Sequence, residues 1–203
     1  MSGGHVNGAV TVAIYIVEYK HWKRNLPIAL IIIIAQLAGG FAACALRGLL
    51  VGWDQLAVLK PTDAGVYRPI WHVFLEEAMF TFLWVAVILH NKYKTIASSS
   101  DGVLHCFTWA LTLFAIVCMA SDQTGACLNP TIGITFMIMD YAATKSLVDK
   151  LIHLLIAYVF GPFLGGILAA IWTKFVGMVA TPLKDDEKSN RFTVQNDEDD
   201  RLI

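Results

Sequence analysis

The chain has 203 residues, and its composition is that of a membrane protein rather than of a water-soluble domain. Apolar residues make up 57% and charged residues 15%, against roughly 45–50% and about 25% in typical soluble domains. Four of the 15 basic and seven of the 16 acidic residues lie after Leu183, so the preceding part is even poorer in charge. A net charge of −1 without a basic stripe gives no electrostatic footprint for nucleic acid. We therefore expect the lipid bilayer as the partner, and no nucleic acid.

Six apolar segments follow one another along the chain. They are, in order, a short segment over 9–19, long ones over 26–46, 70–89 and 103–121, a second short one over 131–139, and a long one over 151–173. The long segments can cross roughly 30 Å of hydrocarbon, which takes about 20 helical residues. The short segments cover about half that distance at 1.5 Å per residue. The sequence predicts an all-α integral membrane fold with four full transmembrane helices and two half-length ones.

Each short segment is preceded by an asparagine, which caps helix N-termini because its side-chain oxygen accepts a hydrogen bond from an unpaired backbone N–H. The two starts read Asn7-Gly8-Ala9 and Asn129-Pro130-Thr131. Proline suits the first helical position because its φ is already helical and its missing N–H costs nothing there. Glycine adds backbone entropy in the unfolded chain, so we expect the first short helix to begin more loosely.

The surroundings of the two asparagines are repeated. Residues 2–7 align with residues 124–129 at an offset of 122, and Gly39-Gly40 aligns with Gly165-Gly166 at an offset of 126. Each copy is thus a small-residue loop, a capped half-helix and then a span whose glycines allow two backbones to pack closely. Short, Gly- or Pro-interrupted segments in matching halves of a chain indicate a functional site near the bilayer midplane.

These motifs resemble the aquaporin family, the major intrinsic proteins. The segment 2–11 is similar to the family's first signature loop, with Gly8 in place of proline, and 124–131 to the second, with Thr131 in place of alanine. The resemblance implies an inverted repeat with two re-entrant half-helices. It also implies six full spans, of which the first two would precede Ser2. Either the chain is part of a longer protein or another subunit supplies these helices.

In the fold that the resemblance implies, Asn7 and Asn129 meet near the bilayer centre and present amide N–H groups to a pore. Two helix N-termini facing one point raise the barrier to protons and cations. The alternative for each asparagine alone is an ordinary N-cap. The resemblance also implies a selectivity filter at three positions, which here are apolar: Val117, Ala126 and Ile132. Such a constriction either passes bulkier neutral solutes or dewets and passes nothing.

Three further residues are candidates for the site. A carboxylate in a membrane span is costly unless it has a partner. The resemblance assigns Glu77 the structural role of accepting hydrogen bonds from the second re-entrant loop, and a proton relay is the alternative. By analogy Cys127 lies near the pore, or else it is a packed small residue. We interpret His5 as a loop-packing residue near the pore rather than as a ligand.

The function that follows is a passive channel for water or small uncharged solutes, as a homotetramer. The rival is a non-conducting, degenerate aquaporin that serves as a structural subunit of a heteromeric membrane complex. We expect no catalytic residue, metal or cofactor, because no nucleophile–base pair appears and the four cysteines share no metal-ligand spacing. The plasma, vacuolar and mitochondrial inner membranes all remain open as locations.

The chain divides into a membrane domain over 1–180, which the resemblance implies is incomplete at its N-terminal end, and a tail over 181–203. The tail is acidic and almost free of aromatic residues. It has too few apolar residues to offset the entropy of ordering, so we expect it to be disordered.

Overall fold

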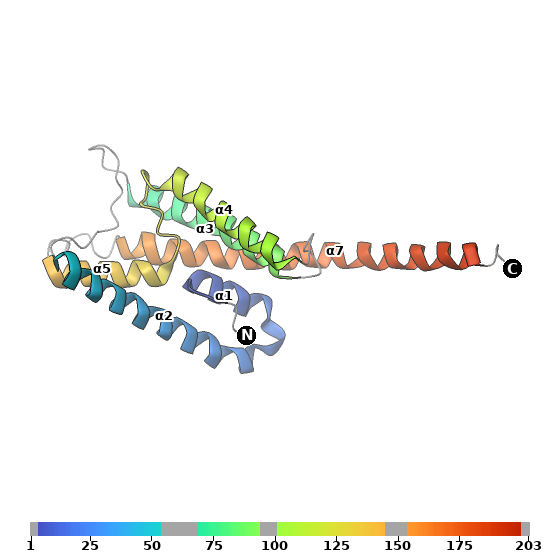
Figure 1. Ribbon diagram of the computed structural model, residues 1–203, viewed down its shortest axis with the longest axis horizontal. Helices are drawn as coiled ribbons and strands as arrows, with labels where there is room; N and C mark the ends of the chain where they lie inside the picture. The colour runs from blue at the N-terminus through green and yellow to red at the C-terminus, as the bar shows by residue number, and fades with distance from the viewer. Residues whose placement is uncertain (1–3, 54–68, 94–100, 145–153, 200–203) are drawn as a thin grey trace.

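The computed structural model describes residues 4–53, 69–93, 101–144 and 154–199, with side chains placed up to Thr181 except that of Asp140. Every regular element in these stretches is helical. Figure 1 shows them in chain order: α1 (Gly8–Val17), the 3-10 turn η1 (Tyr19–His21), α2 (Trp22–Val51), α3 (Ile70–Lys92), α4 (Gly102–Ala120), α5 (Pro130–Thr144), the π-helical turn η3 (Ile156–Phe160) and α7 (Gly161–Asp199).

Four of the described helices are long and apolar enough to cross a membrane, and α1 and the start of α5 are apolar but short. The predicted all-α fold with four spans and two half-length helices is therefore confirmed. Three of the spans, α2, α3 and α7, run past the predicted ends, as in α2, which begins at Trp22 instead of residue 26. A hydropathy pattern marks the width of the hydrocarbon, whereas the helix continues into polar flanks. Residues 151–153 of the last predicted span lie outside the described residues.

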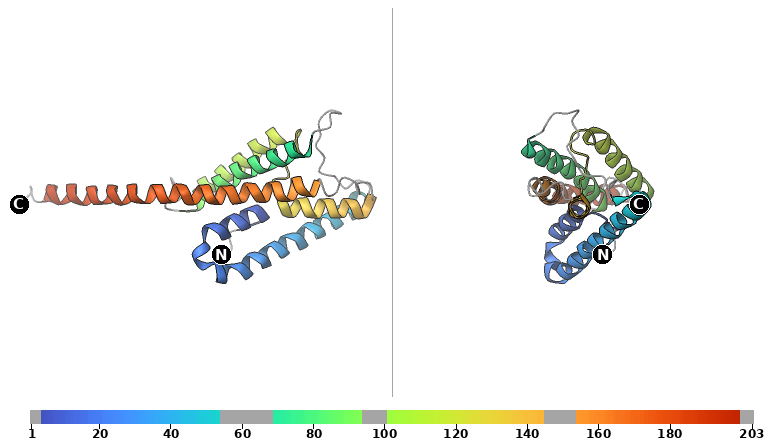
Figure 2. Two further views of the ribbon diagram at one scale, coloured as in Figure 1. Left: turned by 180° about the vertical axis from the view of Figure 1, so that it is seen from behind. Right: turned by 90° about the vertical axis from the view of Figure 1, so that its left-hand side faces the viewer.

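The two short helices lie in line, end to end, between α2 and α7 (Figure 1). Each short helix packs against the long helix of the other repeat: α1 packs against α7, and α5 packs against α2. On the far side of α7 from α2 lie α3 and α4, which both Figure 1 and Figure 2 show side by side. This arrangement brings the N-terminal ends of α1 and α5 together in the middle of the molecule.

The glycine pairs provide the close contacts that hold the short helices. A Cβ at Gly166 of α7 would lie 2.8 Å from the carbonyl oxygen of Ala9 in α1. The equivalent Gly40 of α2 packs against Thr135 of α5, where a Cβ would lie 2.7 Å from the threonine Cγ2. Each short helix is therefore seated on the second glycine of the opposite repeat, as close packing of membrane helices requires.

The main core cluster joins three elements. It contains Ala9, Val10, Ala13 and Ile14 of α1, Val85 and Leu89 of α3, and Ala169 and Ala170 of α7. Small residues dominate on α1 and α7, which lets those two backbones approach closely. The apolar face of α1 is therefore covered by α7 and α3.

The segment over 181–203 that the sequence sets apart as a tail begins within α7. The backbone of α7 continues without a break to Asp199 and projects beyond the other helices (Figure 1). A polar composition excludes a packed core, but it does not stop the extension of a helix that is already nucleated, because each added residue gains one hydrogen bond. The expectation that residues 181–203 are disordered stays a prediction.

Candidate functional site

Asn7 and Asn129 stand at the N-terminal ends of α1 and α5, and their side-chain oxygens cap these helices. Asn7 Oδ1 accepts from the backbone N–H of Ala9 at 2.8 Å and of Val10 at 3.4 Å. Asn129 Oδ1 accepts from the backbone N–H of Thr131 at 3.1 Å and from its hydroxyl at 2.7 Å. Each oxygen is thus occupied by its own helix, and each amide nitrogen is left to donate elsewhere.

The amide nitrogens link the two repeats reciprocally. Asn7 Nδ2 donates to the carbonyl oxygen of Leu128 at 2.8 Å, and Asn129 Nδ2 donates to that of Val6 at 2.9 Å. The backbone N–H of Gly8 adds a third link to Asn129 Oδ1 at 3.3 Å. An amide NH₂ has two hydrogens, so each asparagine keeps one for a further acceptor. The two helix ends meet and are joined by hydrogen bonds.

Gly8 has a steric role at this junction. A Cβ at Gly8 would lie 3.0 Å from Cγ2 of Thr131 and 3.1 Å from Cγ of Pro130. Glycine at this position therefore lets the start of α1 sit directly against the start of α5. The sequence suggested only the entropic consequence of the missing proline.

Glu77 of α3 holds the loop before α5. Its Oε1 accepts from the hydroxyl of Thr124 at 2.6 Å and from the backbone N–H of Cys127 at 3.0 Å, and Oε2 accepts from the backbone N–H of Leu128 at 2.7 Å. The loop adopts left-handed backbone at Ala126 (φ 50) and Leu128 (φ 51), which costs roughly 1–2 kcal/mol per residue. The three bonds to a fully buried carboxylate offset this cost.

The loop before α1 is held by a different residue. Gln36 Nε2 of α2 donates to the carbonyl oxygen of His5 and to the hydroxyl of Thr11, the latter at 3.1 Å. Val6, directly before the capping asparagine, is 78% exposed, whereas its counterpart Leu128 is 2% exposed. The first loop is therefore held by Gln36 and by the link from Asn129 to Val6, and its side chain before the asparagine is more exposed than that of the second loop.

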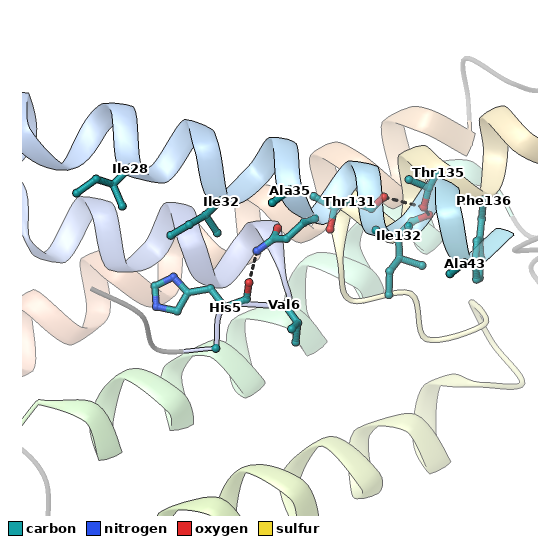
Figure 3. A pocket seen from close by; sticks show the side chains of 14 residues that line it. His5, Val6, Ile28, Ile32, Ala35, Ala43, Thr131, Ile132, Thr135 and Phe136 are labelled. Atoms are coloured by element: carbon teal, nitrogen blue, oxygen red, sulfur yellow. Dashed lines mark hydrogen bonds between the residues drawn. The ribbon is translucent and has the colours of Figure 1, made fainter. Parts of the chain in front are cut away.

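Two cavities meet at the first loop, and both are lined by Gly4, His5 and Val6. The larger, the α2 groove, has a volume of about 730 Å³ and is lined besides by Ile28, Ile32, Ala35, Gln36, Gly39, Gly40, Ala43, Thr131, Ile132, Thr135 and Phe136. Figure 3 shows its side chains on α2 facing the first loop and the start of α5. The smaller, the α3 cavity, has a volume of about 260 Å³ and is lined besides by Asn7, Val10, Ile14, Trp84, Ile88, Lys92 and Trp109.

The proposed filter positions do not surround one cavity. Ile132 lines the α2 groove, whereas Val117 of α4 and Ala126 line neither cavity. Ala126 packs instead beside the buried cluster of Phe80 and Leu128. The three positions were assigned to one filter by the family resemblance alone.

His5 and Cys127 have different surroundings, although they hold equivalent places in the two loops. His5 lines both cavities. Cys127 is 7% exposed and belongs to a buried cluster with Met137 and Tyr158, and its thiol donates to the carbonyl oxygen of Asn129 at 3.2 Å. Cys127 is therefore a packed residue behind the asparagine.

The arrangement offers amide donors and electropositive helix ends in apolar surroundings. Each helix N-terminus carries about half a positive charge, which disfavours cations at the junction. Both oxygens of Glu77 accept hydrogen bonds from the loop. Within the described residues no cluster of His, Cys, Asp and Glu is placed to hold a metal ion. These are conditions for a neutral, hydrogen-bonding solute.

Two residues that contribute to the site were not identified from the sequence. Gln36 is the polar residue in the middle of an apolar span, and that signal could have found it. Tyr158 donates its hydroxyl to the carbonyl oxygen of Thr124 at 2.5 Å. No pattern distinguishes Tyr158 from other aromatic residues of an apolar run.

The chain is similar in sequence to a family of known proteins. Residues 1–172 match the family model described as "Major intrinsic protein". The chain is 31% identical over 184 residues to the glycerol uptake facilitator protein-like 6 of Lactiplantibacillus plantarum, covering 87% of this chain and 76% of that protein. It is 28% identical over 186 residues to the aquaporin AqpM of Methanothermobacter thermautotrophicus, covering 87% of this chain and 68% of that protein.

The fold has a counterpart among solved structures. The aquaglyceroporin from Plasmodium falciparum superposes with a TM-score of 0.64, covering 91% of this chain and 76% of that one, at 20% sequence identity. At that identity the likeness concerns the fold.

Proposed function

Because the chain belongs to the major intrinsic protein family, whose members are passive channels and not enzymes, we propose that this integral membrane protein conducts water or small uncharged solutes. The observation that supports this most directly is the reciprocal pairing of Asn7 and Asn129. Each asparagine uses its oxygen for its own helix and one amide hydrogen for the opposite loop. The second hydrogen of each is available to a passing oxygen atom.

Exclusion of ions follows from the same junction. A cation at the point where α1 and α5 meet would face two positive helix ends without a compensating carboxylate, because Glu77 lies behind the second loop. A neutral solute loses its hydration only in part, since the asparagines replace some of its hydrogen bonds. Such a site discriminates by charge without chemistry.

We further propose that the constriction is apolar, with Val117, Ala126 and Ile132 as the filter positions. Ile132 supports this proposal most directly, since it lines the α2 groove beside the start of α5. Apolar walls favour solutes bulkier than water, and the name of the relative from Lactiplantibacillus plantarum refers to glycerol. Glycerol is therefore the first solute to test beside water.

The family typically forms oligomers, and we propose a homotetramer for this chain. Large apolar side chains are exposed along α4, among them Phe107, Leu111 and Phe114 at 63%, 63% and 67%. Lipid or neighbouring subunits can cover this face. Chemical cross-linking of the purified protein should give a ladder that ends at four copies.

The test of conduction uses vesicles that contain the full chain. After an osmotic jump they should shrink faster than empty vesicles, and an inward glycerol gradient should make them swell faster. Asn129→Asp should slow both rates, because a carboxylate has no amide hydrogen to donate. The control Asn91→Asp changes the same residue type at the end of α3. If wild-type and empty vesicles behave alike, the chain alone does not conduct.

One observation favours the rival function, a structural subunit of a heteromeric complex. The α2 groove lies open along the first half, and a Cβ at Gly39 within it would meet nothing within 4 Å. A partner helix could fill this groove. Purification in mild detergent should then recover unrelated membrane proteins in fixed ratio, whereas a conducting homotetramer without partners would exclude this role.

A further inference from the structure

The turn between α1 and α2 gathers positive charge at one end of the helix bundle. Lys20, Lys23 and Arg24 follow one another within five positions, and all three are exposed. Lys174 of α7 lies beside them, because its Nζ is 3.6 Å from the centroid of the Tyr19 ring. The negative face of an aromatic ring attracts a cation, so Lys174 is held at this turn. We call these four basic residues the basic turn surface.

A carboxylate also stands at this turn, and its oxygens are used by neighbouring elements. Nδ2 of Asn25 on α2 donates to Oε2 of Glu18, and the hydroxyl of Tyr93 after α3 donates to Oε1, each at 3.3 Å. Figure 1 shows the end of α3 and the turn at the same end of the bundle. Asn25 is buried, so Glu18 is bonded toward the helix contacts behind the turn. One carboxylate therefore stands against four cations, and the surface keeps a positive charge.

The basic turn surface lies where the lipid-facing part of α2 begins. From Leu26 to Leu46 every exposed residue of α2 is apolar, so the hydrocarbon starts directly after Arg24. Tyr19 and Trp22 are exposed beside the cations, and these residue types are enriched where a membrane meets water. The four cations therefore lie at the level of the lipid headgroups.

This position selects a partner that carries both a negative charge and acyl chains. The chains of a phospholipid pack along the apolar face of α2, and its headgroup then stands beside the cations. A soluble anion would gain the charge attraction alone. The acidic residues 185–187 of the same chain do not compete, because α7 continues as a helix and carries them roughly 16–20 Å beyond Lys174.

We propose that the basic turn surface binds the headgroup of an anionic phospholipid. Clusters of four to eight Lys and Arg residues beside a membrane span attract such lipids, by about fivefold in affinity for each residue. Lys174 forms the fixed side of the site because the Tyr19 ring holds it, and the exposed cations of the turn close around the phosphate. The inference assigns a partner to a surface outside the asparagine junction and does not depend on conduction.

Lipid binding can be counted directly. The full chain in a neutral detergent is titrated with phosphatidylserine and, separately, with phosphatidylcholine of the same acyl chains, and native mass spectrometry counts the bound lipids. Phosphatidylserine should bind first and at least fivefold more tightly. Lys23→Gln should lower its association constant about fivefold and leave that of phosphatidylcholine unchanged, whereas Lys23→Arg should keep both. Equal binding of the two lipids to the wild type would overturn the inference.

A control variant and two competitors locate the site and identify its occupant. Arg47→Gln removes an exposed cation near the other end of α2 and should leave phosphatidylserine binding unchanged. An effect as large as that of Lys23→Gln would show attraction to the whole chain instead of a site. Glycerophosphoserine, the headgroup without acyl chains, should not displace the lipid. If it does, the surface binds free anions, and if a peptide of residues 184–203 does, the surface binds acidic segments. Either displacement would make the lipid assignment wrong.

Discussion

Val6 and Leu128 occupy equivalent positions, each directly before a capping asparagine, yet 78% of Val6 and 2% of Leu128 is exposed. The caps themselves are alike, since both asparagines accept from backbone N–H groups of the first turn. The loops differ in their anchors. The second loop is bonded to Glu77 and Tyr158, and the first is bonded to Gln36.

The glycine pairs repeat this difference. A Cβ at Gly165 would collide with the carbonyl oxygen of Ala78 on α3, whereas one at the equivalent Gly39 would meet nothing within 4 Å. The second half therefore has a helix packed on its first glycine and an acid bonded to its loop, and both belong to α3. The cap is therefore a local property of the sequence, while the anchoring of the loop depends on a helix elsewhere in the chain.

The largest effect is expected from removing the anchor of the second loop. Glu77→Ala leaves the backbone N–H groups of Cys127 and Leu128 and the hydroxyl of Thr124 without their acceptor. We expect a loss of about 3–5 kcal/mol in the free energy of unfolding, measured by denaturant titration in mixed micelles. Glu76→Ala, one residue earlier on a different face of α3, is the control. Equal losses in the two variants would show that Glu77 does not hold the loop.

The two caps should differ in strength. Asn129 Oδ1 accepts three hydrogen bonds, including one from Gly8 of the other repeat, and Asn7 Oδ1 accepts two. Asn129→Ala should therefore cost about 2–3 kcal/mol and Asn7→Ala about 1–2 kcal/mol in the same titration. A reversed order would mean that the repeats are less alike than their hydrogen bonds indicate.

The first glycines of the two pairs should change the free energy of unfolding in opposite directions when each is replaced by alanine. Gly165→Ala places a methyl group against Ala78 and should cost about 1–3 kcal/mol. Gly39→Ala meets open space and should gain up to about 1 kcal/mol, because alanine favours a helix over glycine. Thermal unfolding of the two variants in detergent distinguishes them. If Gly39→Ala is as destabilising as Gly165→Ala, another helix covers the α2 groove in the folded protein.

The smallest effect concerns the second anchor of the same loop. Tyr158→Phe removes the donor to the carbonyl oxygen of Thr124 and should cost about 1 kcal/mol in unfolding titrations. Tyr141→Phe, at a tyrosine that is 38% exposed, should change stability by less than about 0.5 kcal/mol. If the two variants have the same stability, Tyr158 does not anchor the second loop.

Local chemistry explains which parts could be predicted from the sequence. Segment lengths depend on one continuous run of residues, and the asparagine caps depend on residues within the first helix turn, so the half-length helices and their starts followed from the pattern. The links from Asn7 to Leu128 and from Asn129 to Val6 join residues more than 120 positions apart and leave no local trace. Glu77 was singled out because a carboxylate in a membrane span needs a partner, and its role in holding the second loop followed from the family resemblance.

The reciprocal links also impose an order on biosynthesis. Asn7 and Leu128 are separated by 121 positions, and chains grow at roughly 5–20 residues per second. Once Asn7 has been made, on the order of ten seconds pass before its partner exists. During that interval α1 must wait without α5 or α7, although its ten residues are too few to cross the bilayer. Of the described helices that α1 contacts, α2 is the one made first, so the contact between α1 and α2 can form before those with α3, α5 and α7.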